Sequence, residues 1–203
     1  NNAINKLNLL SNSTNSSKYG SLFGVINNAT TSIGRRHLKD RLLMPIINPE
    51  ELQKRYDLAE FFLRKDDDGK YLYDMTETLL TGIIDIERLH RKLELRILHP
   101  SEFHSLHTSY MKINELISYI KNNYNKDDII YSLLLKGKSK EKFNEFQLEY
   151  QDNFEMSELH KFLINDITGR LLKKGVNKEL DELVNSIEDS KKKLKDMADE
   201  MNQ

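Results

Sequence analysis

The chain has 203 residues, of which 38% are hydrophobic and 31% charged, and only eight are glycine and three proline. So few turn-forming residues, together with Leu, Ile, Phe and Tyr at regular intervals, predict an all-α protein with a packed core and exclude a disordered chain. The formal net charge of −1 argues against a surface that binds polyanions over its whole extent, and the absence of cysteine excludes disulfides, thiolate zinc sites and cysteine nucleophiles.

No stretch of the sequence is apolar enough for secretion or for membrane insertion. None approaches the roughly eighteen consecutive apolar residues of a membrane span, and the N-terminal residues lack the apolar core of a signal peptide. We therefore expect an intracellular, non-secreted protein with no membrane partner. Because the sequence starts without methionine and stops without a helix-stop signal, we also expect it to be part of a longer chain.

Start and stop signals outline the first helices. Residues 11–20 read SNSTNSSKYG, which predicts a Ser/Asn-rich loop. Thr31 or Ser32 can cap a helix that runs through Leu43 and ends before Pro45.

The next helix has the clearest start in the chain. Asn48 is a good N-cap, Pro49 suits the first helical position, and two glutamates follow in the first turn. The run KDDDGK at residues 65–70 predicts a turn that ends this helix. One or two further helices are expected in residues 71–98, with an interruption near Gly82 and with Asp85 capping the second.

A long amphipathic helix is expected from Pro100 to about residue 120, because apolar residues recur at alternating spacings of three and four. A polar loop over 122–128 follows. Residues 129–135 fit either a helix or a strand, and we favour a helix from the context. Helices are also predicted over 139–150 and 157–172, the second closing at the Lys-Lys-Gly of residues 173–175.

The last segment has a seven-residue apolar repeat. Its members are Val176, Leu180, Leu183, Ile187, Ser190, Leu194, Met197 and Met201, with Ser190 as the one polar break. This pattern predicts a long continuous helix over 176–203 that requires a partner helix. No other segment of the sequence matches it in length and pattern, so we expect a helical core over 1–175, a protruding helix over 176–203, and a partner helix encoded downstream.

Motifs for chemistry are scarce. Neither Gly-x-x-x-x-Gly-Lys-Ser/Thr nor Gly-x-Gly-x-x-Gly occurs, so we expect no nucleotide site in this chain. His99, His104 and His107, with Glu102, nominally offer zinc ligands, but no His-Glu-x-x-His motif forms and we favour histidines without a metal. No catalytic, cofactor-binding or metal-binding residue is assigned.

Two groups of charged residues, paired carboxylates and clustered cations, can be either solvent-exposed or functional. The carboxylate pairs Asp85/Glu87 and Asp181/Glu182 are interpreted as solvated faces of charged helices rather than as acid–base pairs. The cations Arg35, Arg36, Lys39 and Arg41 spread over a broad helix face. A solvated or salt-bridging face is favoured for them over phosphate contact, because no aromatic side chain is interleaved to stack on bases.

Three stretches, in this order, resemble the central region of MutS-family DNA mismatch-repair proteins. The first lies within residues 21–63 and includes Ser21, Leu22, Asn27, Thr31, Gly34, Arg36, Leu38, Lys39, Leu42, Pro45, Arg55, Asp57 and Phe62. The second is DIERL at 85–89 followed by HPSEF at 99–103, and the third is GVNKELDEL at 175–183. Arg41 stands where the family usually has tryptophan, which indicates a divergent member.

The resemblance implies an all-α core and lever domain, an irregular multi-helix bundle whose long C-terminal lever helix runs towards a clamp domain outside the chain. The parent protein is then expected to be a dimeric, DNA-dependent ATPase that uses ATP and Mg²⁺ and binds mismatched double-stranded DNA through other domains. This segment itself is expected not to be an enzyme. Arg36 and its neighbours are expected to serve the helical core, and the DNA-binding residues remain unknown.

Two other readings stay open at this point. The chain can be a stand-alone helical scaffold that dimerises through the repeat at 176–203, which Leu183→Asp would abolish. It can also be a small metalloenzyme that uses the histidine cluster, in which case zinc would be lost on His104→Ala.

Overall fold

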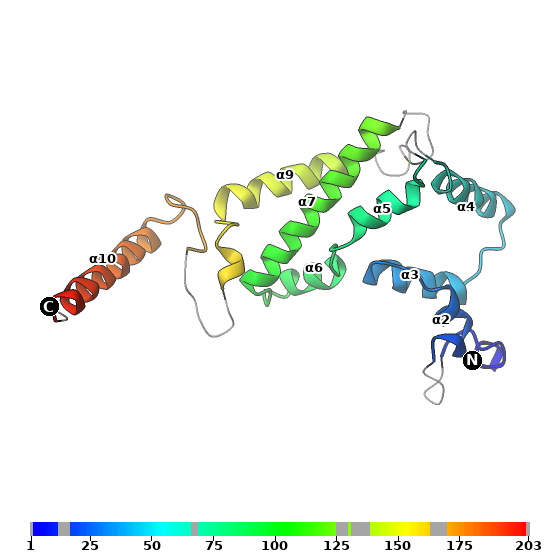
Figure 1. Ribbon diagram of the computed structural model, residues 1–203, viewed down its shortest axis with the longest axis horizontal. Helices are drawn as coiled ribbons and strands as arrows, with labels where there is room; N and C mark the ends of the chain where they lie inside the picture. Colours follow the sequence, from blue (N-terminus) through cyan, green and yellow to red (C-terminus); the bar gives the residue numbers. More distant parts are fainter. Residues whose placement is uncertain are drawn as a thin grey trace. The chain divides into compact units, whose positions relative to one another are not determined.

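The computed structural model describes residues 2–11, 17–65, 69–124, 130, 139–162 and 170–201. In these ranges all regular elements are helices, and extended pairing is confined to two isolated bridges, Lys65 with Tyr71 and Phe154 with Leu172. The predicted all-α class is therefore confirmed. Figure 1 follows the helices in chain order.

The chain divides into two compact units. The first holds residues 1–98 and 105–136, and the second holds residues 99–104 and 137–203. The helices of the first unit are α1 (Asn2–Lys6), η1 (Lys18–Gly20), α2 (Leu22–Ile26), α3 (Ser32–Leu43), α4 (Pro49–Phe62), α5 (Leu72–Leu80), α6 (Ile86–Glu94) and most of α7 (Pro100–Asn123). The second contains the first turn of α7, α9 (Ser139–Asn153), η2 (Leu159–Lys161) and α10 (Lys178–Met201).

The short helices η1 and α2 are held together at a glycine. The Ser21 hydroxyl caps α2 by accepting a hydrogen bond from the Gly24 N–H at 3.1 Å. A Cβ at Gly24 would lie 2.2 Å from the carbonyl oxygen of Lys18. The absence of a side chain at this position therefore allows the two helices to approach.

The predicted caps of three helices are confirmed. Thr31 accepts from the Gly34 N–H at 3.0 Å at the start of α3, and Asn48 accepts from the Glu50 N–H at 2.9 Å at the start of α4. Asp85 accepts from the Arg88 N–H at 3.3 Å at the start of α6. Each cap satisfies a backbone donor that has no partner inside its own helix.

The interruption between α5 and α6 lies at Gly82, as predicted, because this residue has a φ of +87°. The backbone after it is tied to α7. Ser109, which is fully buried, accepts from the Ile84 N–H at 3.2 Å and donates to the Ser105 carbonyl at 3.0 Å. One hydroxyl thus satisfies a backbone donor of the connecting segment and a carbonyl of α7.

The apolar core of the first unit forms where α4, α5 and α7 meet. Its buried members are Phe61, Leu72, Ile120 and Ile130. The ring of Phe61 lies 5.2 Å from that of Tyr124, and Arg64 lies over the same Phe61 ring. The helix α4 ends at Phe62, before the predicted turn at 65–70, and Lys65 pairs with Tyr71. Residues 66–68 of that turn lie outside the described ranges.

The second unit is built on aromatic contacts with the first turn of α7. The Phe103 ring lies 5.2 Å from the rings of both Tyr150 and Phe154. The Glu155 N–H donates to the Leu171 carbonyl at 3.0 Å, next to the bridge between Phe154 and Leu172. This pairing fixes the chain after α9.

The predicted helix over 157–172 is wrong at both described ends. Only η2 is helical there, Phe162 is extended with a ψ of 105°, and Leu172 lies in a bridge. Leu159 and Phe162 are buried, so the apolar spacing reflects a packed irregular segment whose backbone pairs with the end of α9. Residues 163–169 lie outside the described ranges.

Other boundaries shift by a few residues. The long helix α7 extends through Asn123, into the predicted loop at 122–128, and α9 continues to Asn153 instead of Tyr150. The last helix starts at Lys178, because Asn177 caps it by accepting from the Leu180 N–H at 3.1 Å. The helix favoured over 129–135 lies outside the described residues except for Ile130, as does much of the predicted loop at 11–20. Among the described helices, none combines the length and apolarity needed to cross a membrane.

Candidate functional site

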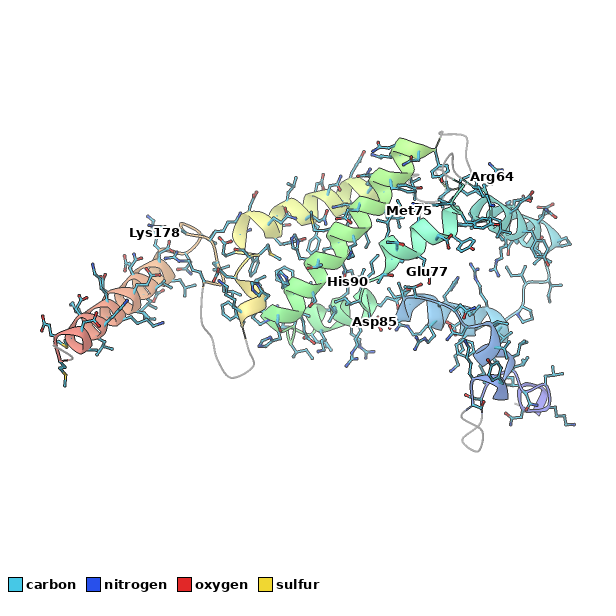
Figure 2. The ribbon with its side chains drawn as sticks, in the orientation of Figure 1. Arg64, Met75, Glu77, Asp85, His90 and Lys178 are labelled. Carbon is cyan, nitrogen blue, oxygen red and sulfur yellow. The ribbon has the colours of Figure 1, made fainter. Side chains whose placement is uncertain are left out.

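Arg36 of α3 forms a charged cluster with two carboxylates at the start of α6. Its guanidinium donates to both oxygens of Asp85, with Nη2 2.8 Å from Oδ1, and to Glu87 Oε2 at 2.5 Å. Figure 2 labels Asp85 at the start of α6, beside α3. Asp85 therefore caps α6 and holds α3 with the same carboxylate.

The electrostatics of this cluster favour the charged states of Arg36 and Asp85. The hydrogen bonds that Arg36 donates to Asp85 and then to Glu87 raise the pKa of Arg36 further above its ordinary value. The hydrogen bond from Arg36 is the main cause that lowers the pKa of Asp85, and the Arg88 N–H adds to it. A second contact joins the same segment to α5, where Thr30 Oγ1 donates to Glu77 Oε1 at 3.2 Å.

The other three cations of the basic segment differ from Arg36. Arg35, Lys39 and Arg41 are exposed, and no ion pair to them occurs among the described residues. Partial loss of water, followed by the like charge of Arg55, lowers the pKa of Arg41. The predicted salt-bridging role is therefore confirmed for Arg36, and the solvated role of its neighbours stays a prediction.

Two histidines of the candidate zinc cluster, His99 and His104, form hydrogen bonds within the protein. The Ser101 hydroxyl contacts His99 Nδ1 at 2.8 Å, and the His99 N–H donates to Glu102 Oε2 at 3.2 Å, as in a capping box. His104 Nδ1 lies 3.1 Å from the Met156 carbonyl oxygen, to which it donates. No group of three His, Cys, Asp or Glu side chains is placed to hold a metal within the ranges that the structure describes.

The carboxylate pairs are only partly solvated, which corrects the sequence interpretation. Asp85 pairs with Arg36, and Asp181 pairs with Arg170, whose Nη1 lies 2.6 Å from its Oδ1. Glu182 is exposed, in agreement with the prediction. Sequence reasoning missed both aspartate contacts because their arginine partners lie 49 and 11 residues away.

The apolar repeat of α10 is present on a helix and is exposed. On α10 these side chains are between 44% exposed, at Leu180, and 87% exposed, at Met201, and the others are Leu183, Ile187, Leu194 and Met197. Val176, the first member of the predicted repeat, is 42% exposed and precedes the helix. A soluble helix normally covers such a stripe. The candidate functional element is therefore α10 together with the residues that fix its first turn.

The fold and these contacts define an all-α helical domain with a long, amphipathic and uncovered helix in the described part. The family model named MutS domain III matches residues 2–203, almost the whole chain. The chain belongs to the MutS domain III family.

Named relatives agree with this assignment. A DNA mismatch repair protein mutS homologue of Acanthamoeba polyphaga mimivirus is 34% identical over 194 residues, which are 93% of this chain and 16% of that protein. DNA mismatch repair protein MutS of Thermodesulfovibrio yellowstonii is 30% identical over 93% of this chain and 20% of its own length. DNA mismatch repair protein MSH6 of Saccharomyces cerevisiae is 28% identical over 62% of this chain and 10% of its own length. The chain thus spans a fifth or less of these relatives.

Proposed function

We propose that this chain is the helical core and outgoing lever of a MutS-type DNA mismatch-repair protein, with residues 1–175 as the core and 176–203 as the lever helix. It would couple ATP binding and hydrolysis in one domain to mismatched-DNA binding in others, none of which this chain contains. The observation that carries the proposal is the exposed apolar stripe of α10 in a chain that MutS domain III matches over residues 2–203.

The mechanics follow from the geometry of a helix. The 24 residues of α10 rise about 1.5 Å each, so the helix can carry a rotation at one end over roughly 36 Å. Its stripe suits an antiparallel companion helix, which we place downstream in the parent protein. A packed pair of helices is stiffer than one helix, so the companion would make the lever effective.

The cofactors belong to other domains in this proposal. ATP and Mg²⁺ are implied for the parent, but this chain has no glycine-rich phosphate loop, and its described residues offer no cluster of three metal ligands. We therefore assign no chemical step to this segment. Mismatched double-stranded DNA, a homo- or heterodimeric state and an intracellular location are likewise proposed for the parent.

The test is Leu183→Asp in the full-length parent, with Asn185→Asp as the matched control on another face of α10. If α10 transmits between sites, Leu183→Asp should leave the basal ATPase rate unchanged and reduce its stimulation by mismatched duplex by about tenfold, within the usual range of coupling energies. Stimulation equal to that of the control would contradict the lever role.

The same exposed stripe also suits a second function, that of a scaffold that pairs with another copy through α10. Sedimentation equilibrium of the 203-residue chain distinguishes the two. Concentration-dependent dimers that Leu183→Asp abolishes would favour the scaffold. A monomer at all concentrations would favour the lever with its companion encoded elsewhere.

A further inference from the structure

One carboxylate holds the start of α10. Asp181 lies in the first turn, and its side chain is only 18% exposed. Its Oδ1 accepts from Arg170 Nη1 at 2.6 Å, and its Oδ2 accepts from the Gly175 N–H at 2.7 Å. Figure 2 labels Lys178, the first residue of this helix. Asp181 thus binds both the backbone and a side chain of the segment that precedes α10.

The backbone around Gly175 suits this contact. Gly175 has a φ of +95°, a left-handed conformation that side-chain-bearing residues rarely adopt. A Cβ added there would meet nothing within 4 Å, so the requirement for glycine concerns the backbone and not space. The bend at this residue lets the Gly175 N–H donate to Asp181.

The segment 170–175 is joined in turn to the end of α9. Lys173 donates its N–H to the Asn153 carbonyl at 2.9 Å, beside the bridge between Phe154 and Leu172. Phe154 contacts Phe103, as described above. Hydrogen bonds and ring contacts therefore run without a break from Asp181 of α10, through 170–175 and 153–154, to the first turn of α7, all within the second unit.

We propose that the carboxylate of Asp181, with Arg170 and the Gly175 N–H, is a rigid joint that makes α10 move together with the end of α9. Without this joint α10 would be a helix on a flexible tether and could transmit no rotation. That the joint transmits a rotation of α10 rests on the proposed lever role. The existence of the joint rests only on the contacts.

The test uses the absence of cysteine from the chain. Spin labels at Glu145→Cys on α9 and Glu188→Cys on α10, both exposed positions, report the spread of distances between the two helices. Asp181→Asn should broaden this distribution about twofold, because it removes the charged acceptor of both bonds. Glu182→Gln removes the same charge from the neighbouring exposed residue and should leave the width unchanged. The proposal of a rigid joint would be refuted by a broad distance distribution in the labelled chain that keeps Asp181. It would also be refuted if Asp181→Asn left the width of the distribution unchanged.

Hydrogen exchange gives a second readout. The Gly175 amide should exchange about tenfold faster in Asp181→Asn than in Glu182→Gln, because its acceptor is weakened. Arg170→Gln leaves that acceptor in place, so it should broaden the distance distribution while the Gly175 amide stays protected. If circular dichroism shows that Asp181→Asn does not fold, Arg170→Gln is the variant that tests the joint. An unchanged width of its distance distribution would refute the joint.

The double variant Asp181→Asn/Arg170→Gln separates one joint from two independent contacts. Its distance distribution should be no broader than that of Asp181→Asn alone, and additive broadening would count against the proposal.

Neither the distance measurement nor hydrogen exchange uses DNA or ATP. A narrow distance distribution, in a protein whose ATPase rate is not stimulated by mismatched DNA, would therefore refute the lever role and support the joint. A broad distance distribution would refute the joint at any ATPase rate.

Discussion

Arg36 shows how one side chain can join helices that are far apart in the sequence. Its partner Asp85 was identified from the sequence as a helix cap, because a cap depends on residues only three positions away. The ion pair itself spans 49 residues and depends on how α3 and α6 pack, which no local pattern encodes. Local chemistry was therefore predictable for Asp85, and its tertiary role was not.

Replacing Arg36 by Gln should loosen α3 from α6. Arg36 is 46% exposed, so water and salt screen the pair and the effect should be small, a decrease in Tm of roughly 1–3 °C at low salt. At about 1 M salt, where the screening length is about 3 Å, most of this difference should disappear. Thermal unfolding at both salt concentrations measures it.

Arg35→Gln is the matched control, since Arg35 is the adjacent exposed cation with no ion pair among the described residues. An equal and salt-independent decrease in Tm for both variants would mean that Arg36 contributes through helix propensity alone.

Asp85 gives a pH dependence of known sign. Its pKa is lowered in the folded state, first by Arg36 and then by the Arg88 N–H, so its contribution to stability is complete above the ordinary aspartate pKa of about 3.9 and is lost as pH falls through the lower folded-state pKa. The Tm difference between the unmodified chain and Asp85→Asn should be constant above about pH 5 and shrink below about pH 4. A difference that grows on acidification would contradict this assignment.

Among the described elements, α7 contains four buried residues, Leu106, Ser109, Tyr110 and Ile120. Leu106 and Tyr110 are 0% and 1% exposed, and Ile120 is 1% exposed at the other end of the helix. The alternating spacing of three and four predicted this helix well, because one face is buried along most of its length. The same reasoning failed for 157–172, where Leu159, in the short 3-10 helix η2, and Phe162, in extended backbone, are buried without an α-helix.

Leu106→Ala should lower the free energy of unfolding by about 2–5 kcal/mol, because it leaves a cavity that its neighbours fill only in part. Met111→Ala on the same helix, at a residue 44% exposed, should cost about 1 kcal/mol or less. Urea unfolding of both variants measures the difference. Equal losses would show that the two faces of α7 are not distinguished by burial.

For the whole molecule, the sequence motifs were sufficient to identify the family, and the repeat at 176–203 was sufficient to predict the long last helix. The division into two units was not predicted, because it depends on contacts between residues distant in sequence. The joint at Asp181 also escaped prediction. Its parts, Arg170, Gly175 and Asp181, become neighbours only when the segment before α10 pairs with the end of α9.

The chain alone should not discriminate mismatched from matched DNA, since no mismatch-reading residue is assigned to it. Fluorescence anisotropy with two duplexes that differ in one base pair should give equal affinities that weaken together as salt rises. Because a solvated face is favoured over phosphate contact for Arg35 and Lys39, a double variant, Arg35→Gln with Lys39→Gln, should leave both affinities nearly unchanged. Tighter binding of the mismatched duplex would mean that part of the mismatch-recognition site lies within this 203-residue chain.

The contact between η1 and α2 bears on how freely this sequence can vary. At Gly24 even the methyl group of alanine would lie 2.2 Å from the Lys18 carbonyl oxygen, so any replacement must push the two helices apart. Its larger neighbours Leu22 and Val25 are 44% and 47% exposed and tolerate many alternatives. In a library of random variants selected for folding, Gly24 should therefore accept fewer substitutions than its neighbours in this segment.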